Sequence, residues 1–141
     1  MQIIGGNLLE VPRGILGHQV NCVKRMGAGL ALQIRRKWPP VYEAFRQEEP
    51  ELGKVLLVEV GEDLHVANLY AQWGVGRTGR QTDYPARTQC RQQVQAWSQQ
   101  LHLPVYLPEY LGCGLAGGDW EGVYGIIART GPEATLVRYR K

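Results

Sequence analysis

Two glycine-rich segments, residues 26–31 and 112–120, each run directly into a stretch with the periodicity of an amphipathic helix. The first N–H groups of a helix have no partner within the helix and carry about half a positive charge, so they bind anions readily. Glycine also lets the backbone approach a ligand closely. One such segment is weak evidence, because glycines also form ordinary turns. Two of them predict a pair of backbone cradles that hold one ligand, such as a diphosphate, from opposite sides.

The segments that must position these cradles alternate between strand and helix patterns. Strands are expected at 2–4, 15–21, 54–60, 64–71, 104–107 and 134–139, and helices at 29–38, 40–49, 83–101 and 119–128. Pro39 and Pro40 end the first helix, and Asp83 has the side chain of an N-cap. This alternation predicts one α/β domain over residues 1–141, with helices on both faces of a central mixed, largely parallel sheet.

In sheets of this kind, ligands bind beyond the carboxyl ends of the strands. Segments 26–31 and 112–120 follow the strands at 15–21 and 104–107, so both are expected at the same edge. Segment 72–82 follows the strand at 64–71 and is expected beside them.

Composition points to a soluble protein of a reducing compartment. Hydrophobic residues are 44% and charged residues 21%, which is typical of globular domains. The N-terminus lacks the layout of a signal peptide, and no apolar run is long enough to span a membrane. Three cysteines without framework spacing indicate free thiols. We therefore expect a cytoplasmic monomer without a membrane partner. The net charge of +3 is mild, and the basic run at 35–37 is expected to form the last turn of a helix.

The glycine segments and their surroundings resemble the macro domain family, whose members bind ADP-ribose in a three-layer α/β/α fold. The resemblance covers nearly the whole chain. It is strongest in the branch that holds terminal ADP-ribose glycohydrolases, ADP-ribose 1″-phosphate phosphatases and antitoxins that remove ADP-ribose from DNA. The matching motifs lie at 6–9 (Gly-Asn-Leu-Leu), 18–22 (His-Gln-Val-Asn-Cys), 26–31 (Met-Gly-Ala-Gly-Leu-Ala), 112–115 (Gly-Cys-Gly-Leu) and 118–121 (Gly-Asp-Trp-Glu).

The resemblance implies a role for each part of the site. Asn7 replaces an aspartate that accepts a hydrogen bond from the adenine amino group, Tyr139 is a candidate to stack on adenine, and Asn21 falls near the distal ribose. Both glycine segments are implied to hold the pyrophosphate. The implied ligand-binding residues are Asn7, Leu8, Asn21, Met26, Gly27, Ala28, Gly29, Leu30, Gly112, Cys113, Gly114, Leu115, Ala116 and Tyr139.

Two departures from the family concern catalysis. The terminal ADP-ribose glycohydrolases use a lysine just after the strand equivalent to 64–71, whereas this chain has no lysine between 68 and 81. They also have an acidic residue where this chain has Ala116, and Asp119 lies three residues further on. A lysine-nucleophile mechanism is therefore not expected.

The candidate catalytic residues are Asp119, His18 and Asn21. Asp119 could be a general acid or base, or a first-turn acid that stabilises a helix. His18 could be a general acid, or a buried histidine on a central strand. Cys22 and Cys113 are expected to be packing residues. No metal or cofactor is expected, because the chain has no Cys-x-x-Cys motif or histidine cluster.

Segment 72–84 is the best candidate for a specificity loop. Arg77 and Arg80 could bind a terminal phosphate through paired N–H groups, or could simply be solvated. Gln72 and Trp73 begin the segment, and Trp73 could cover the ligand or pack beneath the loop.

The expected function is binding of ADP-ribose or a derivative. If the protein is an enzyme, it is a hydrolase of ADP-ribose 1″-phosphate or of an ADP-ribosyl conjugate. One alternative is a non-catalytic reader or sponge for ADP-ribose, cyclic ADP-ribose or an ADP-ribosylated macromolecule, either protein or nucleic acid. Another is removal of ADP-ribose from nucleic acid, which the charge permits and the missing lysine disfavours.

Overall fold

The computed structural model describes residues 2–74, 82–109 and 134–139. The helix expected at 119–128 lies outside these residues.

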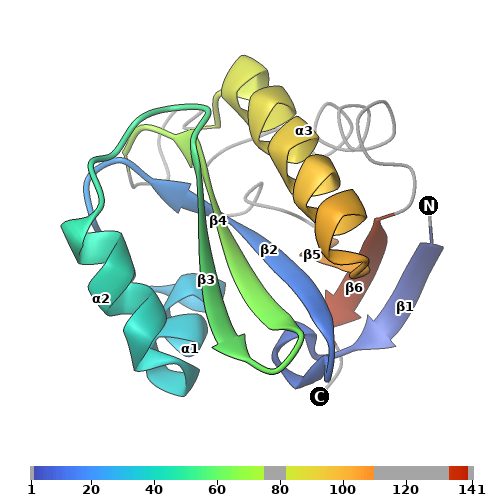
Figure 1. The fold of residues 1–141 in the computed structure, drawn as a ribbon. Helices are drawn as coiled ribbons and strands as arrows, with labels where there is room; N and C mark the ends of the chain where they lie inside the picture. Colours follow the sequence, from blue (N-terminus) through green and yellow to red (C-terminus); the bar gives the residue numbers. More distant parts are fainter. Residues whose placement is uncertain (1, 75–81, 110–133, 140–141) are drawn as a thin grey trace.

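A six-stranded sheet forms the centre of the molecule, with strand order β1-β6-β5-β2-β4-β3 (Figure 1). Four of its five strand pairings are parallel, and only the β3–β4 hairpin is antiparallel. The sheet is therefore mixed and largely parallel, as predicted. The strands are β1 (Gln2–Gly6), β2 (Gly14–Asn21), β3 (Val55–Gly61), β4 (Leu64–Gln72), β5 (Val105–Pro108) and β6 (Thr135–Tyr139).

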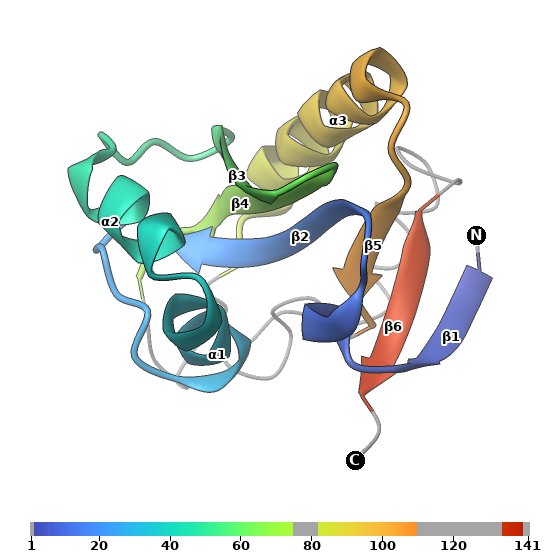
Figure 2. The same cartoon turned by 60° about the horizontal axis from the view of Figure 1, so that its bottom comes forward.

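Helices cover both faces of this sheet, which confirms the three-layer prediction. Figure 2 shows α1 and α2 on one side of the sheet and α3 on the other. The helices are α1 (Gly29–Lys37), α2 (Pro39–Gln47) and α3 (Tyr84–Leu101), and a short 3-10 turn, η1 (Leu8–Glu10), follows β1.

Local chemistry explains where the helices begin and end. Proline at the first position of α2 fits a helix start but cannot continue α1, so α1 ends at Lys37. The Asp83 carboxylate accepts a hydrogen bond from Ala86 N at 2.8 Å, which confirms the predicted N-cap of α3. The basic run forms the last turn of α1, as expected, and α2 ends at Gln47, two residues earlier than predicted.

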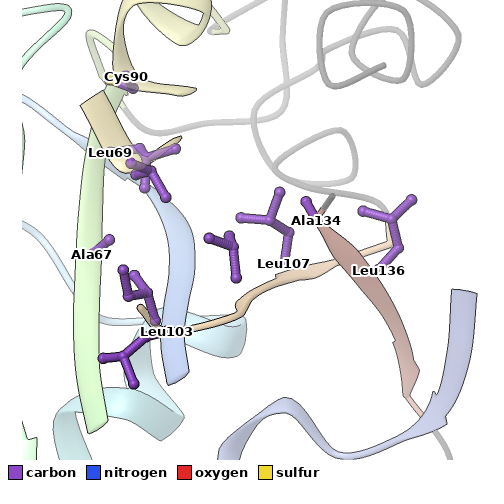
Figure 3. Close-up of a cluster of buried hydrophobic side chains, with 10 residues drawn as sticks. Ala67, Leu69, Cys90, Leu103, Leu107, Ala134 and Leu136 are labelled. Carbon is purple, nitrogen blue, oxygen red and sulfur yellow. The ribbon is translucent and has the colours of Figure 1, made fainter. Parts of the chain in front are cut away.

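Each face of the sheet has its own apolar core. On the α3 side, Cys90 and Val94 pack with strand residues such as Ala67, Leu69 and Leu107 (Figure 3). On the other side, Ile34 of α1 and Phe45 of α2 pack against the alternate strand residues, including Val66 and Tyr70. Because successive strand side chains point to opposite faces, the two cores share the same strands.

A glycine of β2 makes room for a side chain of β5 at the centre of the sheet. A Cβ at Gly17 of β2 would lie 2.5 Å from Leu107 Cδ2 of β5, closer than side-chain atoms pack. The absence of a side chain at Gly17 therefore leaves room for the Leu107 side chain in the buried cluster beside β2.

Among the described residues, no helix has the length and apolar character needed to cross a membrane.

Candidate functional site

The predicted site residues that the structure describes gather at the carboxyl edge of the parallel strands. Asn7 follows β1, while Asn21, Gln72 and Tyr139 end β2, β4 and β6. This arrangement confirms the expected placement of the first glycine segment and the start of segment 72–82 at one edge. The second glycine segment begins beyond the described end of β5.

A pocket of about 190 Å³ opens at this edge between α1 and the ends of β1, β5 and β6. Its wall contains two uncharged carboxamides, from Asn7 and Gln33, among mostly apolar side chains. Among the described residues this wall has no charged group, which suits a flat, neutral group such as a nucleobase. The lining residues are Asn7, Leu8, Leu30, Gln33, Pro108, Val137 and Tyr139, four of which are implied ligand-binding residues.

Asn7 has a fixed orientation beside this pocket. Its Oδ1 accepts a hydrogen bond from Leu9 N at 3.0 Å and so caps η1. A carbonyl oxygen has a second lone pair, so Asn7 retains the capacity to accept a bond from a ligand. Tyr139, which is 63% exposed, leaves much of its surface free to contact a base.

The N-terminus of α1 is open, and it adjoins the pocket through Leu30 and Gln33. Ala28 is the N-cap but its side chain makes no capping hydrogen bond, and the first turn contains no acidic residue. Gly27, Ala28 and Gly29 are exposed, and a Cβ built at Gly27 would meet no atom of the described residues within 4 Å. Met26, only 1% exposed, anchors this segment in the core. The first N–H groups of α1 are thus available to an anion.

Asn21 is buried and holds the turn that leads to this helix. Its Oδ1 accepts hydrogen bonds from Val23 N and Arg25 N, both at 3.1 Å, and its Nδ2 donates to Arg25 O at 2.7 Å. Most of its hydrogen-bonding capacity is therefore used within the protein. The geometry favours a positioning role for Asn21 over direct chemistry.

His18 lies on a central strand and is buried, with 2% of its surface exposed. Its Nε2 is 2.6 Å from Asn68 Oδ1, and Asn68 Nδ2 donates to Leu56 O. Because the Asn68 oxygen faces His18, Nε2 carries the proton and donates it. Burial lowers the pKa of His18 to about 4, so the ring is neutral at physiological pH. These observations fit a structural residue that links neighbouring strands by hydrogen bonds better than a general acid.

Hydrogen bonds join the beginning of segment 72–82 to β2 and to the turn that follows β2. Gln72 accepts a bond from Gln19 Nε2 at 2.8 Å and donates to Gly74 O at 2.7 Å. Trp73 O accepts from Cys22 N at 2.9 Å, which places the end of β4 beside the turn after β2. The Trp73 side chain is 63% exposed, so it does not pack beneath described residues.

The described thiols are poor nucleophiles. Cys22 and Cys90 are buried, and burial raises the pKa of both thiols, that of Cys90 to about 12. In the part of the chain that the structure describes, no three His, Cys, Asp or Glu residues group as metal ligands would.

Several predicted residues lie outside the described residues, so their roles stay predictions. They are Arg77, Arg80, Gly112, Cys113, Gly114, Leu115, Ala116 and Asp119.

Sequence reasoning missed part of the site. Gln33 lines the pocket one helical turn after Leu30, a spacing that could have indicated the shared face. It also missed an ion pair between the ends of β5 and β6, in which Arg138 Nε and Nη2 donate to the two Glu109 carboxylate oxygens, both at 2.7 Å. This hydrogen-bonded guanidinium lowers the pKa of Glu109. Nothing in the sequence pairs these two distant positions.

Comparison with known proteins places the fold in a family. No protein-family model matches the chain. A solved structure of a protein of unknown function from Bacteroides thetaiotaomicron is 31% identical, with 99% of this chain and 97% of that one covered and a TM-score of 0.87. The macrodomain of Mycobacterium tuberculosis DarG is 25% identical over 99% of this chain and 97% of that one, with a TM-score of 0.78.

Two further similarities carry information about ligands. A curated relative, the DNA ADP-ribosyl glycohydrolase of Mycobacterium tuberculosis, is 36% identical over 61 residues, which are 40% of this chain and 17% of that enzyme. Thermosipho africanus DarTG, solved in complex with ADP-ribose, shares the fold at 19% identity and a TM-score of 0.78, over 99% of this chain and 42% of that one. Because its three-layer fold matches these macrodomain structures over nearly the whole chain, the chain belongs to the macro domain family.

Proposed function

We propose that this protein binds ADP-ribose, or a molecule that carries it, along the carboxyl edge of the sheet. The observation that carries the proposal is the adjacency of a neutral pocket and an open helix N-terminus. Leu30 and Gln33 line the pocket, and they belong to the helix whose first N–H groups are free for an anion. A neutral base joined to a diphosphate matches that pair of features. The relative solved with ADP-ribose supports the same ligand.

In this proposal the adenine occupies the pocket. Asn7 accepts a hydrogen bond from its amino group, and Tyr139 lies against the ring. The diphosphate follows at Gly27–Gly29, where the helix dipole and the backbone N–H groups offset its charge. The distal ribose then lies toward the carboxyl ends of β2 and β4.

The reaction we propose is hydrolysis that removes ADP-ribose from nucleic acid. The similarity to DNA ADP-ribosyl glycohydrolases supports this substrate. Water adds across the bond between the distal ribose C1″ and the base, releasing ADP-ribose and restoring the base. Since no lysine lies between 68 and 81, water replaces a lysine as the attacking group. Asp119 is the residue we propose to activate it, because His18 is neutral and already bonded to Asn68.

Calorimetric titration with ADP-ribose, with AMP and ADP as controls, tests the binding site. We expect micromolar affinity for ADP-ribose and weaker binding of AMP. Gly27→Ala is the most informative variant, because its new Cβ has no neighbour within 4 Å among the described residues and the described fold should be unaffected. The methyl group instead occupies space that the diphosphate needs, and affinity should fall about tenfold, or 1.4 kcal/mol.

Gly61→Ala is the matched control, because its Cβ makes only an ordinary contact 3.7 Å from Leu64 Cβ in the β3–β4 hairpin. Equal ADP-ribose affinity in Gly27→Ala and Gly61→Ala would contradict the diphosphate site. No binding by the wild type at millimolar ADP-ribose would overturn the proposed function.

Turnover is tested with an ADP-ribosylated single-stranded oligonucleotide, with release of ADP-ribose followed by chromatography. Parallel reactions contain ADP-ribose 1″-phosphate and an ADP-ribosylated protein. We expect release from the oligonucleotide, and a loss of at least a hundredfold in Asp119→Asn. Phosphate release alone would identify a phosphatase, and binding without any turnover would identify a reader.

A further inference from the structure

Four exposed residues lie together at the carboxyl ends of β2 and β4. Val23, Lys24 and Arg25 follow β2, and Trp73 follows β4; we call them the β2–β4 surface. The hydrogen bond from Cys22 N to Trp73 O, at 2.9 Å, brings these distant parts of the sequence side by side. Trp73 is 63% exposed and Val23 is 40% exposed, so an aromatic ring and an aliphatic side chain face solvent beside two cations.

Neither Lys24 nor Arg25 forms an ion pair with an acidic side chain among the described residues. Three other basic side chains of the described residues are paired with acids, Arg13 with Asp63, Lys54 with Glu48 and Arg138 with Glu109. Lys24 and Arg25 instead stand a few residues before the N-terminus of α1, which carries positive partial charge of its own. Such an accumulation of positive charge is unfavourable without an anionic partner, and it attracts one.

The turn that carries these cations is held in one conformation. Asn21 bonds to the backbone of Val23 and Arg25, and Lys24 has a φ of 60°. Residues other than glycine rarely adopt this left-handed region. A fixed turn costs less entropy on binding than a free loop would.

We propose that the β2–β4 surface binds the single-stranded nucleic acid next to an ADP-ribosylated base. Lys24 and Arg25 contact backbone phosphates, and Trp73 stacks on a neighbouring base. Exposed aromatic rings beside free cations are the combination that binds single strands without regard to sequence. An acidic protein segment would use the cations but would not need the flat ring. The inference rests on the proposed function for the position of the distal ribose, which lies toward these strand ends.

Binding of an unmodified, fluorescein-labelled single-stranded oligonucleotide, followed by anisotropy, tests the surface without ADP-ribose. We expect Trp73→Ala to weaken binding on the order of tenfold. The double variant Lys24→Gln/Arg25→Gln should weaken it at low salt. It should also reduce the slope of log K against log salt by about 1.4, since each phosphate contact on a single strand contributes about 0.7.

Two matched controls change the same residue types elsewhere. Arg36→Gln removes an exposed cation from the last turn of α1, and Trp97→Ala removes a 37% exposed ring from α3. Both should leave oligonucleotide binding and its salt slope unchanged. Losses in the controls equal to those in the surface variants would overturn the proposal, because they would indicate non-specific attraction. Absence of oligonucleotide binding by the wild type at low salt would overturn it as well.

The wild-type titration with ADP-ribose separates this inference from the proposed function. ADP-ribose binding without any oligonucleotide binding would support the proposed function and overturn nucleic-acid binding at the β2–β4 surface. Oligonucleotide binding that depends on Trp73, Lys24 and Arg25, without ADP-ribose binding, would support the role of the β2–β4 surface and overturn the proposed function. Binding of an acidic peptide that depends on the cations but not on Trp73, with no oligonucleotide binding, would assign the surface to protein instead.

Discussion

At the scale of single residues, the buried polar side chains near the carboxyl edge are largely committed to the protein itself. His18 and Asn68 link β2, β4 and β3 through two side-chain hydrogen bonds, and Asn21 holds the turn before α1. Burying such groups is costly unless they are hydrogen-bonded, so their pairing supports the fold. Among the described residues, the groups that remain for a ligand are mostly backbone N–H groups, the pocket carboxamides, exposed rings and the side chains of Lys24 and Arg25. The edge therefore suits recognition through shape and backbone N–H groups.

His18 predicts a specific pH dependence of stability. Its pKa is lowered from 6.5 to about 4 by burial, so the unfolded chain binds a proton more readily than the folded protein. The contribution that the neutral His18 ring makes to the free energy of unfolding is fully present above pH 6.5, and it is lost as the pH falls toward 4. Between pH 7 and pH 5 the free energy of unfolding should fall by about 2 kcal/mol from this residue.

Urea unfolding at the two pH values measures this effect, with His18→Gln as the comparison because glutamine cannot titrate. The variant should be less stable at pH 7 and should lose about 2 kcal/mol less than the wild type on going to pH 5. Proton NMR of the wild type provides a check that does not need the variant to fold. A His18 ring that titrates near pH 6.5 would contradict both its burial and its bond to Asn68.

At the scale of helices and strands, local patterns predict most of the architecture. Prolines, an N-cap and alternating apolar residues set the element bounds, so the strands and helices expected within the described residues are found within about two residues of their predicted ends. These signals act over a few residues and can be recognised in one sequence.

Contacts between distant elements explain what the sequence left undetected. A backbone hydrogen bond from Cys22, just before the turn at Val23–Arg25, to Trp73 brings the two segments together, and no local pattern encodes it. The cations there were not recognised as a binding surface because the aromatic ring beside them comes from another strand. The Glu109–Arg138 ion pair could not be predicted from the sequence for the same reason, because it joins the ends of two different strands, β5 and β6.

Gly17 provides a test of how the two central strands position the site. In Gly17→Ala the new Cβ meets Leu107 Cδ2 at 2.5 Å in a fully buried cluster, so Leu107 or the strands must shift. Overpacking of this kind should lower the free energy of unfolding by about 1–3 kcal/mol. Because β2 leads directly to the first glycine segment, ADP-ribose affinity should fall too.

Urea unfolding and calorimetry of Gly17→Ala measure both effects, and Gly61→Ala again serves as the control. Its ordinary contact with Leu64 should change stability by no more than about 0.5 kcal/mol. If Gly17→Ala is as stable as the wild type, the Leu107 side chain accommodates the new Cβ without cost and Gly17 is not required for the packing of this cluster.

At the scale of the whole molecule, the site divides into parts with different physical character. The neutral pocket is formed by α1 and the ends of β1, β5 and β6, and the positively charged β2–β4 surface lies at the other strands. The open N-terminus of α1 connects them. A ligand that occupies the pocket and the helix terminus thus contacts elements from both the beginning and the end of the chain. The unfolded chain has no such arrangement.

Ligand binding should therefore stabilise the entire fold. For a ligand that binds only the folded state, a concentration of 100 times Kd adds about 2.7 kcal/mol to the free energy of unfolding. In a domain of 141 residues, this gain should raise Tm by roughly 8–10 °C. AMP lacks the second phosphate and the distal ribose, so at the same concentration its weaker binding should give a smaller shift. Differential scanning fluorimetry over a series of ADP-ribose concentrations measures both, and Gly27→Ala should need about ten times more ADP-ribose for the same shift. A Tm that does not move at millimolar ADP-ribose would show that the pocket and the helix terminus do not act together on this ligand.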